Sequence, residues 1–497
     1  MAGVLLIRPL CEGDEPEFAE PLGIERLAGY LRVHGVPDVR VVDRRLPVME
    51  RRAGIAREAE LGFYDTLKLI YPAGSEPQLV GLSLMTVTDV PDARRIVNRL
   101  HSWWPKARFV VGGVLVTGAP DVVATAFPPY VTLLPGEGES LLLSLAQGGS
   151  SCMDGGFVTS VAPPRNVCSD IGDDAARQGD VRGMGSPTVS PDDWAVPFRP
   201  DLERYAALGC AVNMQTSRGC PGRCAFCATP GLPGELRRWQ PRSSPLVVDE
   251  IQREAERLLE AGLSPVFNFV DDDFGSLERL EDLADELDRR DLHVACACEM
   301  RFASLAGQPN LASRLQRLHE AGLTRVFFGI ESLNPDTLAW WRKPLNVQAL
   351  PDVLQAFRQA HVAVQVGYIL WHSRQTIEGA CEEVRTLHDL GIYSHRAALS
   401  RLIAFPGCAL AAEGVDAQGF QPMDTREEAF IQRFAEEAQG FAGEYIQHLV
   451  AEPYQAACAF LTGDETYLKA LKRHIDSVNE QSYDLFMRLS QDWGPRV

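Results

Sequence analysis

Three cysteines with a regular spacing lie in one short stretch of the chain. Cys220, Cys224 and Cys227 follow the pattern C-x3-C-x2-C in TSRGCPGRCAFCATP. Clustered thiolates are soft ligands that suit an iron–sulfur cluster or zinc. A cubane cluster usually takes four cysteines, so three local ones leave the fourth iron an open coordination position, as a reactive centre requires. Zinc needs a fourth ligand nearby, for which Cys210 and Cys296 are poorly spaced. Three unrelated buried thiols are the remaining alternative.

Charged residues stand where strand-like runs end further along the chain. Asp271, Asp272 and Asp273 close the run PVFNFVDDD, and Arg301 closes HVACACEMR. A carboxylate can pair with an ammonium group, and a guanidinium can hold a carboxylate through two parallel hydrogen bonds. The alternatives are a helix N-terminal cap near Ser276 for the three acids and a surface position for Arg301. The alternating thiols of HVACACEMR are better explained as small buried residues.

Strand and helix patterns alternate between residues 206 and 410. The predicted strands cover residues 213–218, 265–273, 293–301, 324–332, 362–370 and 398–407, with amphipathic helical segments between them. This alternation predicts a partial (β/α)6 TIM barrel, whose chemistry belongs at the carboxyl ends of the strands. Residues 411–497 have an acidic, helical pattern and predict a C-terminal helical domain.

The first 147 residues also alternate, which predicts an α/β domain with a Rossmann-like doubly wound parallel sheet. The predicted strands cover residues 4–10, 38–45, 78–85, 107–113 and 130–139. Small and polar residues gather where the later strands end: Ser83, Leu84 and Thr86, then Gly112 and Gly113, then Gly136, Glu137 and Gly138. Glycines there let a ligand approach the backbone, although tight strand-to-helix turns are an alternative.

Composition and charge narrow the class of protein. Residues 148–205 are rich in Gly, Ser, Asp and Pro, which predicts an interdomain linker between the domains 1–147 and 206–410. The net charge of −19 argues against a nucleic-acid partner. The first residues resemble neither a signal peptide nor a transit peptide, and no apolar stretch has the length of a membrane span. We therefore expect a cytoplasmic protein with no membrane partner.

The cysteine loop resembles that of the radical S-adenosylmethionine (SAM) enzymes, in which an aromatic residue, here Phe226, precedes the last cysteine. The resemblance implies a [4Fe-4S] cluster on the three cysteines and reductive cleavage of SAM to a 5′-deoxyadenosyl radical. The family pattern also covers Lys343, whereas the loop GYILWHSRQT has His372 and Arg374 where other residues are usual. The implied SAM contacts are Phe226, Asp272, Asp273, Arg301, Gly329, Glu331 and Ser332.

The first 145 residues are similar to the cobalamin-binding domain of cobalamin-dependent radical SAM enzymes of the class B methyltransferase type. The similarity rests on PLGIERLAGYL, on VVD at 41–43, and on SLMT, GG and GEGE. It implies that cobalamin binds at the strand ends described above, at Ser83, Leu84, Thr86, Gly112, Gly113, Gly136, Glu137 and Gly138. The motif D-x-H-x-x-G is absent from CEGDEPEFAE, which implies that no histidine of this loop binds cobalt.

Together these resemblances predict methyl transfer from methylcobalamin to an unactivated carbon of a small molecule or peptide. They also imply an electron donor of the flavodoxin or ferredoxin type. One alternative is a radical SAM enzyme that catalyses a rearrangement, cyclisation or ring contraction, with cobalamin absent or not a methyl donor. A second alternative is a non-catalytic metal-binding interaction protein.

Overall fold

A computed structural model describes residues 3–11, 19–55, 62–149, 189–232, 234–405, 407–414 and 422–493. The chain divides into two compact units, one containing most described residues up to Pro200 and the other most of those from Asp201 onward. Most of the predicted linker 148–205 and most of the loop CEGDEPEFAE lie outside the described residues.

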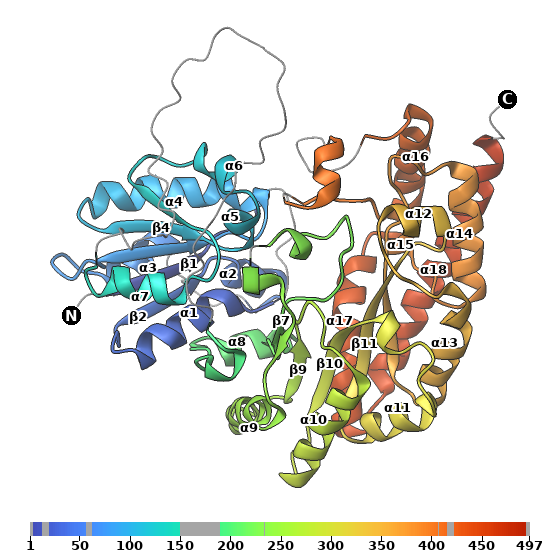
Figure 1. Ribbon diagram of the computed structural model, residues 1–497, viewed down its shortest axis with the longest axis horizontal. Coiled ribbons are helices and arrows are strands. Elements are labelled where there is room, and N and C mark those ends of the chain that lie inside the picture. Colours follow the sequence, from blue (N-terminus) through green and yellow to red (C-terminus); the bar gives the residue numbers. More distant parts are fainter. Residues whose placement is uncertain are drawn as a thin grey trace, which may run out of the picture. The chain divides into compact units, whose positions relative to one another are not determined.

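The first unit is built on a five-stranded parallel sheet in the order β2-β1-β3-β4-β5. Figure 1 labels β1, β2 and β4 of this sheet. Its strands are β1 (Val4–Arg8), β2 (Val39–Asp43), β3 (Leu79–Ser83), β4 (Arg108–Gly112) and β5 (Val131–Leu134). Its helices are α1 (Leu22–Val33), α2 (Leu46–Arg52), α3 (Phe63–Ile70), α4 (Val90–Trp103), α5 (Val114–Gly118), α6 (Pro120–Ala124) and α7 (Glu139–Ala146).

Both faces of this sheet are covered, which explains the almost continuous apolar sequence of β1. Leu5 and Ile7 belong to a core that includes α4, whereas Val4 and Leu6 belong to a second core that includes α1 and α7. Strands buried on both faces are typical of a doubly wound sheet. Chain order reverses between β1 and β3, and ligands of such folds bind beyond the carboxyl ends at this switch point. The predicted fold class of this part is confirmed.

The second unit contains another five-stranded parallel sheet, in the order β12-β11-β10-β9-β6, and a two-stranded sheet. The strands are β6 (Val212–Met214), β7 (Ser217–Arg218), β8 (Gln240–Pro241), β9 (Val266–Phe269), β10 (Ala295–Arg301), β11 (Leu323–Glu331) and β12 (Ala363–Tyr368). The helices around the larger sheet are α8 (Leu202–Ala207), α9 (Ser244–Glu260), α10 (Leu277–Arg289), α11 (Leu311–Glu320), α12 (Pro335–Trp340), α13 (Leu350–Gln359), α14 (Ile377–Asp389) and α15 (His395–Leu399).

The two faces of the larger sheet differ in polarity. Cys298, Val326 and Phe328 point into the core that the helices cover. The alternate positions on the other face include Glu299 and Arg325, which are only partly buried. This polar face is the inner face expected of a partial barrel.

The predicted strand at 398–407 does not form as expected, so this prediction is wrong in detail. Residues His395–Leu399 make the short helix α15, because Ser394 accepts a hydrogen bond from the Ala397 backbone N–H as an N-terminal cap. A parallel bridge between Trp371 and Arg401 lies where the sixth strand was predicted. The barrel class is confirmed, but β12 is an edge strand.

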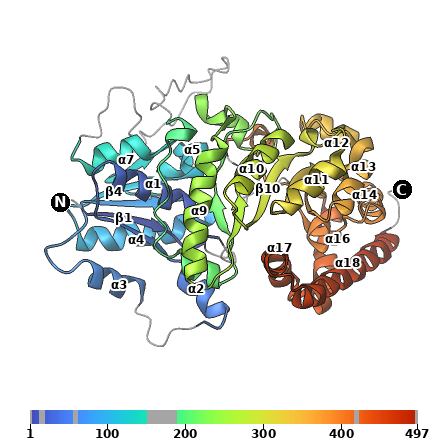
Figure 2. The same ribbon diagram turned by 90° about the horizontal axis from the view of Figure 1, so that it is seen from below.

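Three long helices follow the barrel: α16 (Thr425–Ala442), α17 (Tyr445–Thr462) and α18 (Thr466–Trp493). Figure 2 shows α17 beside α18, and Ala457 of α17 packs on Val266 and Ala295 at the amino ends of β9 and β10. The predicted helical C-terminus is confirmed. None of the helices among the described residues combines the length and the apolar character needed to cross a bilayer.

Candidate active site

The cysteine loop starts at β7 and is held in place by a buried carboxylate. Asp271 accepts hydrogen bonds of 2.7 Å from the backbone N–H groups of Thr216 and Ser217, and one of 2.5 Å from the Thr216 hydroxyl. Gly219 has a φ of 72°, and a Cβ atom there would lie 2.5 Å from the carbonyl oxygen of Arg238. Asp271 therefore anchors the loop instead of facing a ligand.

The three cysteines are partly exposed free thiols. Gly222 lies between two of them: its N–H donates to Cys220 Sγ at 3.3 Å, and a Cβ atom there would be 3.3 Å from Cys220 Sγ and 3.9 Å from Cys224 Sγ. Burial raises the pKa of Cys220 to about 11 and also raises the pKa of Cys224, so both need a cation to become thiolates at neutral pH.

This donor set fits a cluster better than a single zinc ion. Within the described residues, no group of three or more His, Cys, Asp or Glu side chains is placed to hold one metal ion. The cysteines of a cubane each bind a different iron and therefore stand further apart than the ligands of one ion. Soft thiolates without a local fourth ligand suit an iron–sulfur cluster.

Beside Cys224 lies an ion pair between Glu331 and Lys343, with Oε1 and Nζ 3.5 Å apart. Glu331 has a φ of 69° and follows a register shift in β11, which turns its side chain over two neighbouring glycines. A Cβ atom at Gly329 would lie 1.9 Å from Glu331 Oε1, and one at Gly367 would lie 3.4 Å from Oε2. Strained backbone of this kind is typical of ligand sites.

The other predicted SAM residues differ in their burial and in their hydrogen-bond partners. Asp273 is buried and accepts from Arg301 Nε at 2.6 Å, so these two predicted SAM contacts pair with each other. Asp272 is exposed and accepts from the Thr229 hydroxyl at 3.2 Å. Ser332 is buried and donates to Glu383 Oε2 at 2.8 Å. The helix cap near these acids is Ser276, whose side chain accepts from the Arg279 N–H.

Behind Phe226 lies an aromatic cluster that the sequence did not reveal. Phe226 contacts Trp341 edge to face with ring centroids 5.5 Å apart, and Trp341 contacts His372 at 5.1 Å. Trp341 and His372 are almost fully buried, and Trp341 Nε1 and His372 Nε2 have no hydrogen-bond partner within the described residues. Burial and the nearby Arg374 lower the pKa of His372 to about 4.

A fourth thiol, Cys408, also lies near the loop. Burial is the main cause that raises the pKa of Cys408, and a charge on Cys227 also raises it. Cys408 packs with Ala225 in one apolar cluster. Its long separation from the other three cysteines in the sequence hid this proximity.

In the first unit, the predicted cobalamin residues gather at the carboxyl ends of β3, β4 and β5. Gly113 has a φ of 103°, and a Cβ atom there would lie 2.4 Å from the Leu84 carbonyl oxygen. The Leu84 N–H donates to the Gly112 carbonyl at 2.9 Å, so the two loops touch. Ser83 ends β3, and the Thr86 side chain caps the short helical turn that follows.

The third loop lies on the adjacent strand. Gly136 has a φ of 87°, and its N–H donates to the Thr117 hydroxyl at 3.0 Å. Glu137 is partly buried, and Gly138 is the N-cap of α7. Because β3, β4 and β5 are adjacent in the sheet, these loops share one edge.

Sequence reasoning missed three apolar residues of this edge. Met85, Val87 and Val114 are 47%, 42% and 52% exposed. Exposed apolar side chains beside close-packed glycines suit a flat, largely apolar ring. Their signal in the sequence is that each lies two to four residues after a buried strand. The two histidines of this unit, His34 and His101, lie at the ends of α1 and α4, at the opposite edge.

Comparison with known families defines the class of protein. Residues 214–384 match the family model of the radical SAM superfamily, so this part of the chain is a radical SAM domain. This match and the methyltransferase relatives support an enzyme, and a radical SAM domain implies a [4Fe-4S] cluster and SAM. The resemblance recognised in the sequence is confirmed.

Individual relatives refine this picture. The chain is 24% identical to an uncharacterized methyltransferase of Pyrococcus horikoshii, over 72% of this chain and 71% of that protein. It is 31% identical to the hopanoid C-2 methylase of Rhodopseudomonas palustris, over 27% of this chain and 25% of that protein. It is 24% identical to the hopanoid C-3 methylase of Methylococcus capsulatus, over 70% of this chain and 61% of that protein.

Two solved structures share the fold. The cobalamin-dependent SAM radical enzyme OxsB, with aqua-cobalamin and SAM bound, matches with a TM-score of 0.70 and 16% identity, over 97% of this chain and 72% of OxsB. The radical SAM methyltransferase TsrM of Kitasatospora setae, with cobalamin and a [4Fe-4S] cluster bound, matches with a TM-score of 0.58 and 19% identity, over 83% of this chain and 74% of TsrM.

Proposed function

We propose that this chain is a cobalamin-dependent radical SAM methyltransferase that acts on an unactivated carbon of a small molecule or peptide. The corrinoid is assigned to residues 1–147, the radical chemistry to residues 206–410, and a supporting role to the helices of residues 411–497. Residues 148–205 are the linker. We also assign the enzyme to the cytoplasm, with a flavodoxin or ferredoxin as electron donor.

The observation that carries the proposal is the group formed by the cysteine loop and the Glu331–Lys343 pair. Cys224 is close enough to both charges for each to affect its pKa. A cluster on the three cysteines would therefore stand beside a carboxylate that two glycines leave room for. When bound, the cluster with SAM supplies a carbon-centred radical, and the corrinoid supplies the methyl group.

The chain's own residues then bind and orient SAM. We assign Glu331 and Lys343 to its charged groups, because charge-assisted hydrogen bonds are short and directional. Arg301 retains donors for a carboxylate, since only its backbone N–H and Nε are bonded to Asp273 within the described residues. Phe226 and Trp341 form an apolar wall behind the loop and exclude water, which a radical reaction requires.

The corrinoid assignment rests on the carboxyl edge of the first sheet. Gly112 and Gly113 let the loops of this edge pack closely on Leu134 and Leu84, and Met85, Val87 and Val114 present apolar surface there. The names of the relatives, which include hopanoid methylases, support methyl transfer over other outcomes. OxsB and TsrM support the fold on which this assignment depends.

The test needs no substrate. Anaerobically purified enzyme is incubated with SAM carrying a deuterated methyl group and a reductant, and 5′-deoxyadenosine and the corrinoid fraction are analysed by mass spectrometry. The proposal predicts both 5′-deoxyadenosine and deuterium in the corrinoid. Deoxyadenosine with an unlabelled corrinoid would favour a rearrangement or cyclisation, and the absence of both products would contradict the proposal.

A further inference from the structure

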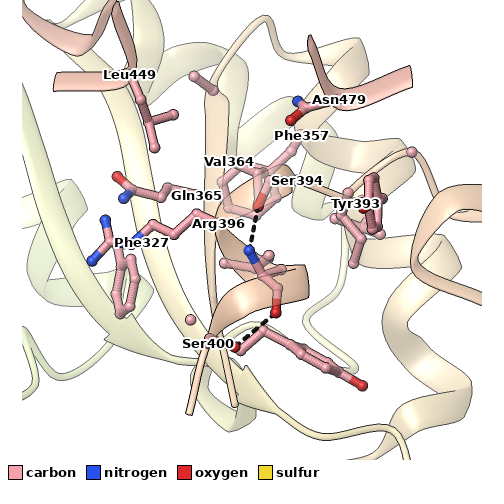
Figure 3. A pocket seen from close by; sticks show the side chains of 18 of the residues that line it. Phe327, Phe357, Val364, Gln365, Tyr393, Ser394, Arg396, Ser400, Leu449 and Asn479 are labelled. Atoms are coloured by element: carbon pink, nitrogen blue, oxygen red, sulfur yellow. Dashed lines mark hydrogen bonds between the residues drawn. The ribbon is translucent and has the colours of Figure 1, made fainter. Parts of the chain in front are cut away.

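A cavity of about 590 Å³ lies in the second unit, along the free edge of β12 (Figure 3). It is lined by residues from both faces of this strand, with Val364 and Val366 on one face and Gln365 and Gly367 on the other. The opposite wall is formed by residues 391–394, Arg396, Ala397 and Ser400, around α15. The cavity therefore lies in the plane of the sheet, where a sixth strand would pair.

The edge of β12 exposes backbone groups to this cavity. The Ile369 N–H donates to the Glu331 carbonyl at 2.8 Å, so the backbone groups of Ile369 face β11. Since these groups alternate along a strand, those of Val364, Val366 and Tyr368 face away from β11. Unpaired edges of this kind are open to hydrogen bonding by a ligand.

The polar side chains of the cavity offer hydrogen-bond donors. Gln365 Oε1 already accepts from Arg325 at 2.7 Å, and Asn479 Oδ1 accepts from the His395 N–H and the Tyr445 hydroxyl at 2.9 Å. The amide NH2 groups of Gln365 and Asn479 can therefore donate hydrogen bonds to a ligand.

A cation accompanies these donors. Arg396 is exposed, and its guanidinium has no hydrogen bond or ion pair within the described residues. In Figure 3 its side chain extends from α15 in the direction of Phe327 and Gln365. The acid among the lining residues, Glu331, is engaged by Lys343. The other cation of the lining, Arg358, donates to the Leu390 carbonyl, so the charge balance of the cavity favours an anion.

The rest of the lining is apolar and partly aromatic: Phe327, Leu354, Phe357, Ile392, Tyr393 and Leu449. From these contacts we infer that the cavity binds an organic carboxylate with an apolar, flat body, its carboxylate paired with Arg396. Because Glu331 belongs both to this lining and to the proposed SAM site, we assign this ligand as the substrate, and this assignment rests on the proposed function.

The cavity volume agrees with this assignment. Ligand pockets of about 300–1,000 Å³ hold most of the surface of a small organic molecule. An acid with an aromatic ring system fills the apolar part and leaves one charged group at the side where Arg396 stands.

The experiment uses the full chain with its cluster reconstituted, and indole-3-acetate and indole-3-acetamide as matched probes in a ligand-observed NMR titration. We expect wild type to bind the acetate about 10-fold more tightly than the amide, because a charge-assisted hydrogen bond adds roughly this factor. Arg396→Gln should remove this preference and leave the amide unchanged. Arg385→Gln, at an exposed position of α14, is the matched control and should behave as wild type.

Two further arms locate the ligand. Val364→Phe fills the cavity and should weaken both probes, whereas SAM, which also carries a carboxylate, should leave their binding unchanged. Binding that Arg396→Gln does not alter, no binding by wild type, or displacement by SAM would each overturn the inference. Iron content and 5′-deoxyadenosine formation in the same preparations report separately on the proposed function, because neither depends on the probes.

Discussion

The two parallel sheets place different kinds of groups at their carboxyl edges. At the edge of the first sheet, glycines bring two loops into contact and leave Met85, Val87 and Val114 exposed. At the edge of the second, the ionic groups pair with one another, as in Asp273 with Arg301 and Glu331 with Lys343. A largely apolar ring needs the first kind of surface, and a charged cofactor bound to a metal cluster needs the second.

The comparison shows that one architecture serves two binding modes through its loops. Both sheets have the same strand number and direction, so the fold alone does not distinguish the sites. The difference arises in the few residues after each strand. Changes on one edge should therefore affect one cofactor and spare the other.

The largest effect is expected from the cysteine loop. Cys224→Ala should remove the cluster and lower 5′-deoxyadenosine formation by at least about 100-fold, because the iron loses one of three local ligands. Corrinoid content should stay at the wild-type level. Iron analysis and deoxyadenosine assays measure both effects. Cys298→Ala is the control, since Cys298 points into the core between the larger sheet and its helices. A variant that keeps its iron would contradict the assignment of the cluster to the three cysteines.

A complementary effect is expected from Gly113→Ala. Its new Cβ atom would lie 2.4 Å from the Leu84 carbonyl oxygen, at a φ that only glycine adopts easily. Corrinoid content should fall by about 10-fold, the consequence of roughly 1.4 kcal/mol of lost binding, and iron content should not change. Gly35 also has a positive φ, but a Cβ atom there meets no atom within 4 Å. Gly35→Ala therefore separates the effect of backbone strain from the effect of losing the contact with Leu84. Equal loss in both variants would contradict the account.

A smaller effect is expected from Glu331→Gln, which keeps the size of the side chain and removes its charge. SAM affinity should fall by about 10-fold, because a charge-assisted hydrogen bond becomes a neutral one. Equilibrium binding of SAM to the reconstituted enzyme measures this, with the exposed Glu320→Gln as the control. Loss of iron together with SAM binding would show that Glu331 supports the loop instead of the ligand.

The smallest effect concerns the aromatic cluster behind Phe226. The pKa of His372 is lowered from 6.5 to about 4, so the neutral ring stabilises the fold above pH 6.5. This contribution is lost as the pH falls from 6.5 toward 4, because the unfolded chain takes up the proton first. Between pH 7 and 4.5 wild type should lose about 2 kcal/mol more than His372→Asn.

Urea unfolding at the two pH values measures this difference, with the exposed His34→Asn as the control. An equal acid sensitivity of wild type and His372→Asn would mean that His372 is not desolvated as the structure indicates.

Much of the fold followed from local patterns. The apolar runs of the first 147 residues predicted the five strands of the first sheet, because strands buried on both faces need uninterrupted apolar sequence. The strand at 398–407 was wrong because Ser394 and the alanines after it favour a helix start, and strand patterns are poor at detecting a local cap.

The site was predictable where its residues are close in sequence. The cysteine loop and the glycine loops were recognised from spacing alone or from family resemblance. The pairing of Asp273 with Arg301, and the positions of Cys408 and His372 near the loop, depend on contacts between distant segments. The exposure of Met85 and Val114 was equally hidden, since apolar residues next to a strand are usually buried.

The most direct test of the central claim is the iron and corrinoid content of wild-type protein, purified without oxygen from cells supplied with hydroxocobalamin. Chemical iron analysis, corrinoid extraction and the absorption spectrum together give both numbers. We expect about four irons and about one corrinoid per chain, one cofactor for each carboxyl edge. Four irons without corrinoid would contradict the assignment of the first sheet, and corrinoid without iron would contradict that of the second.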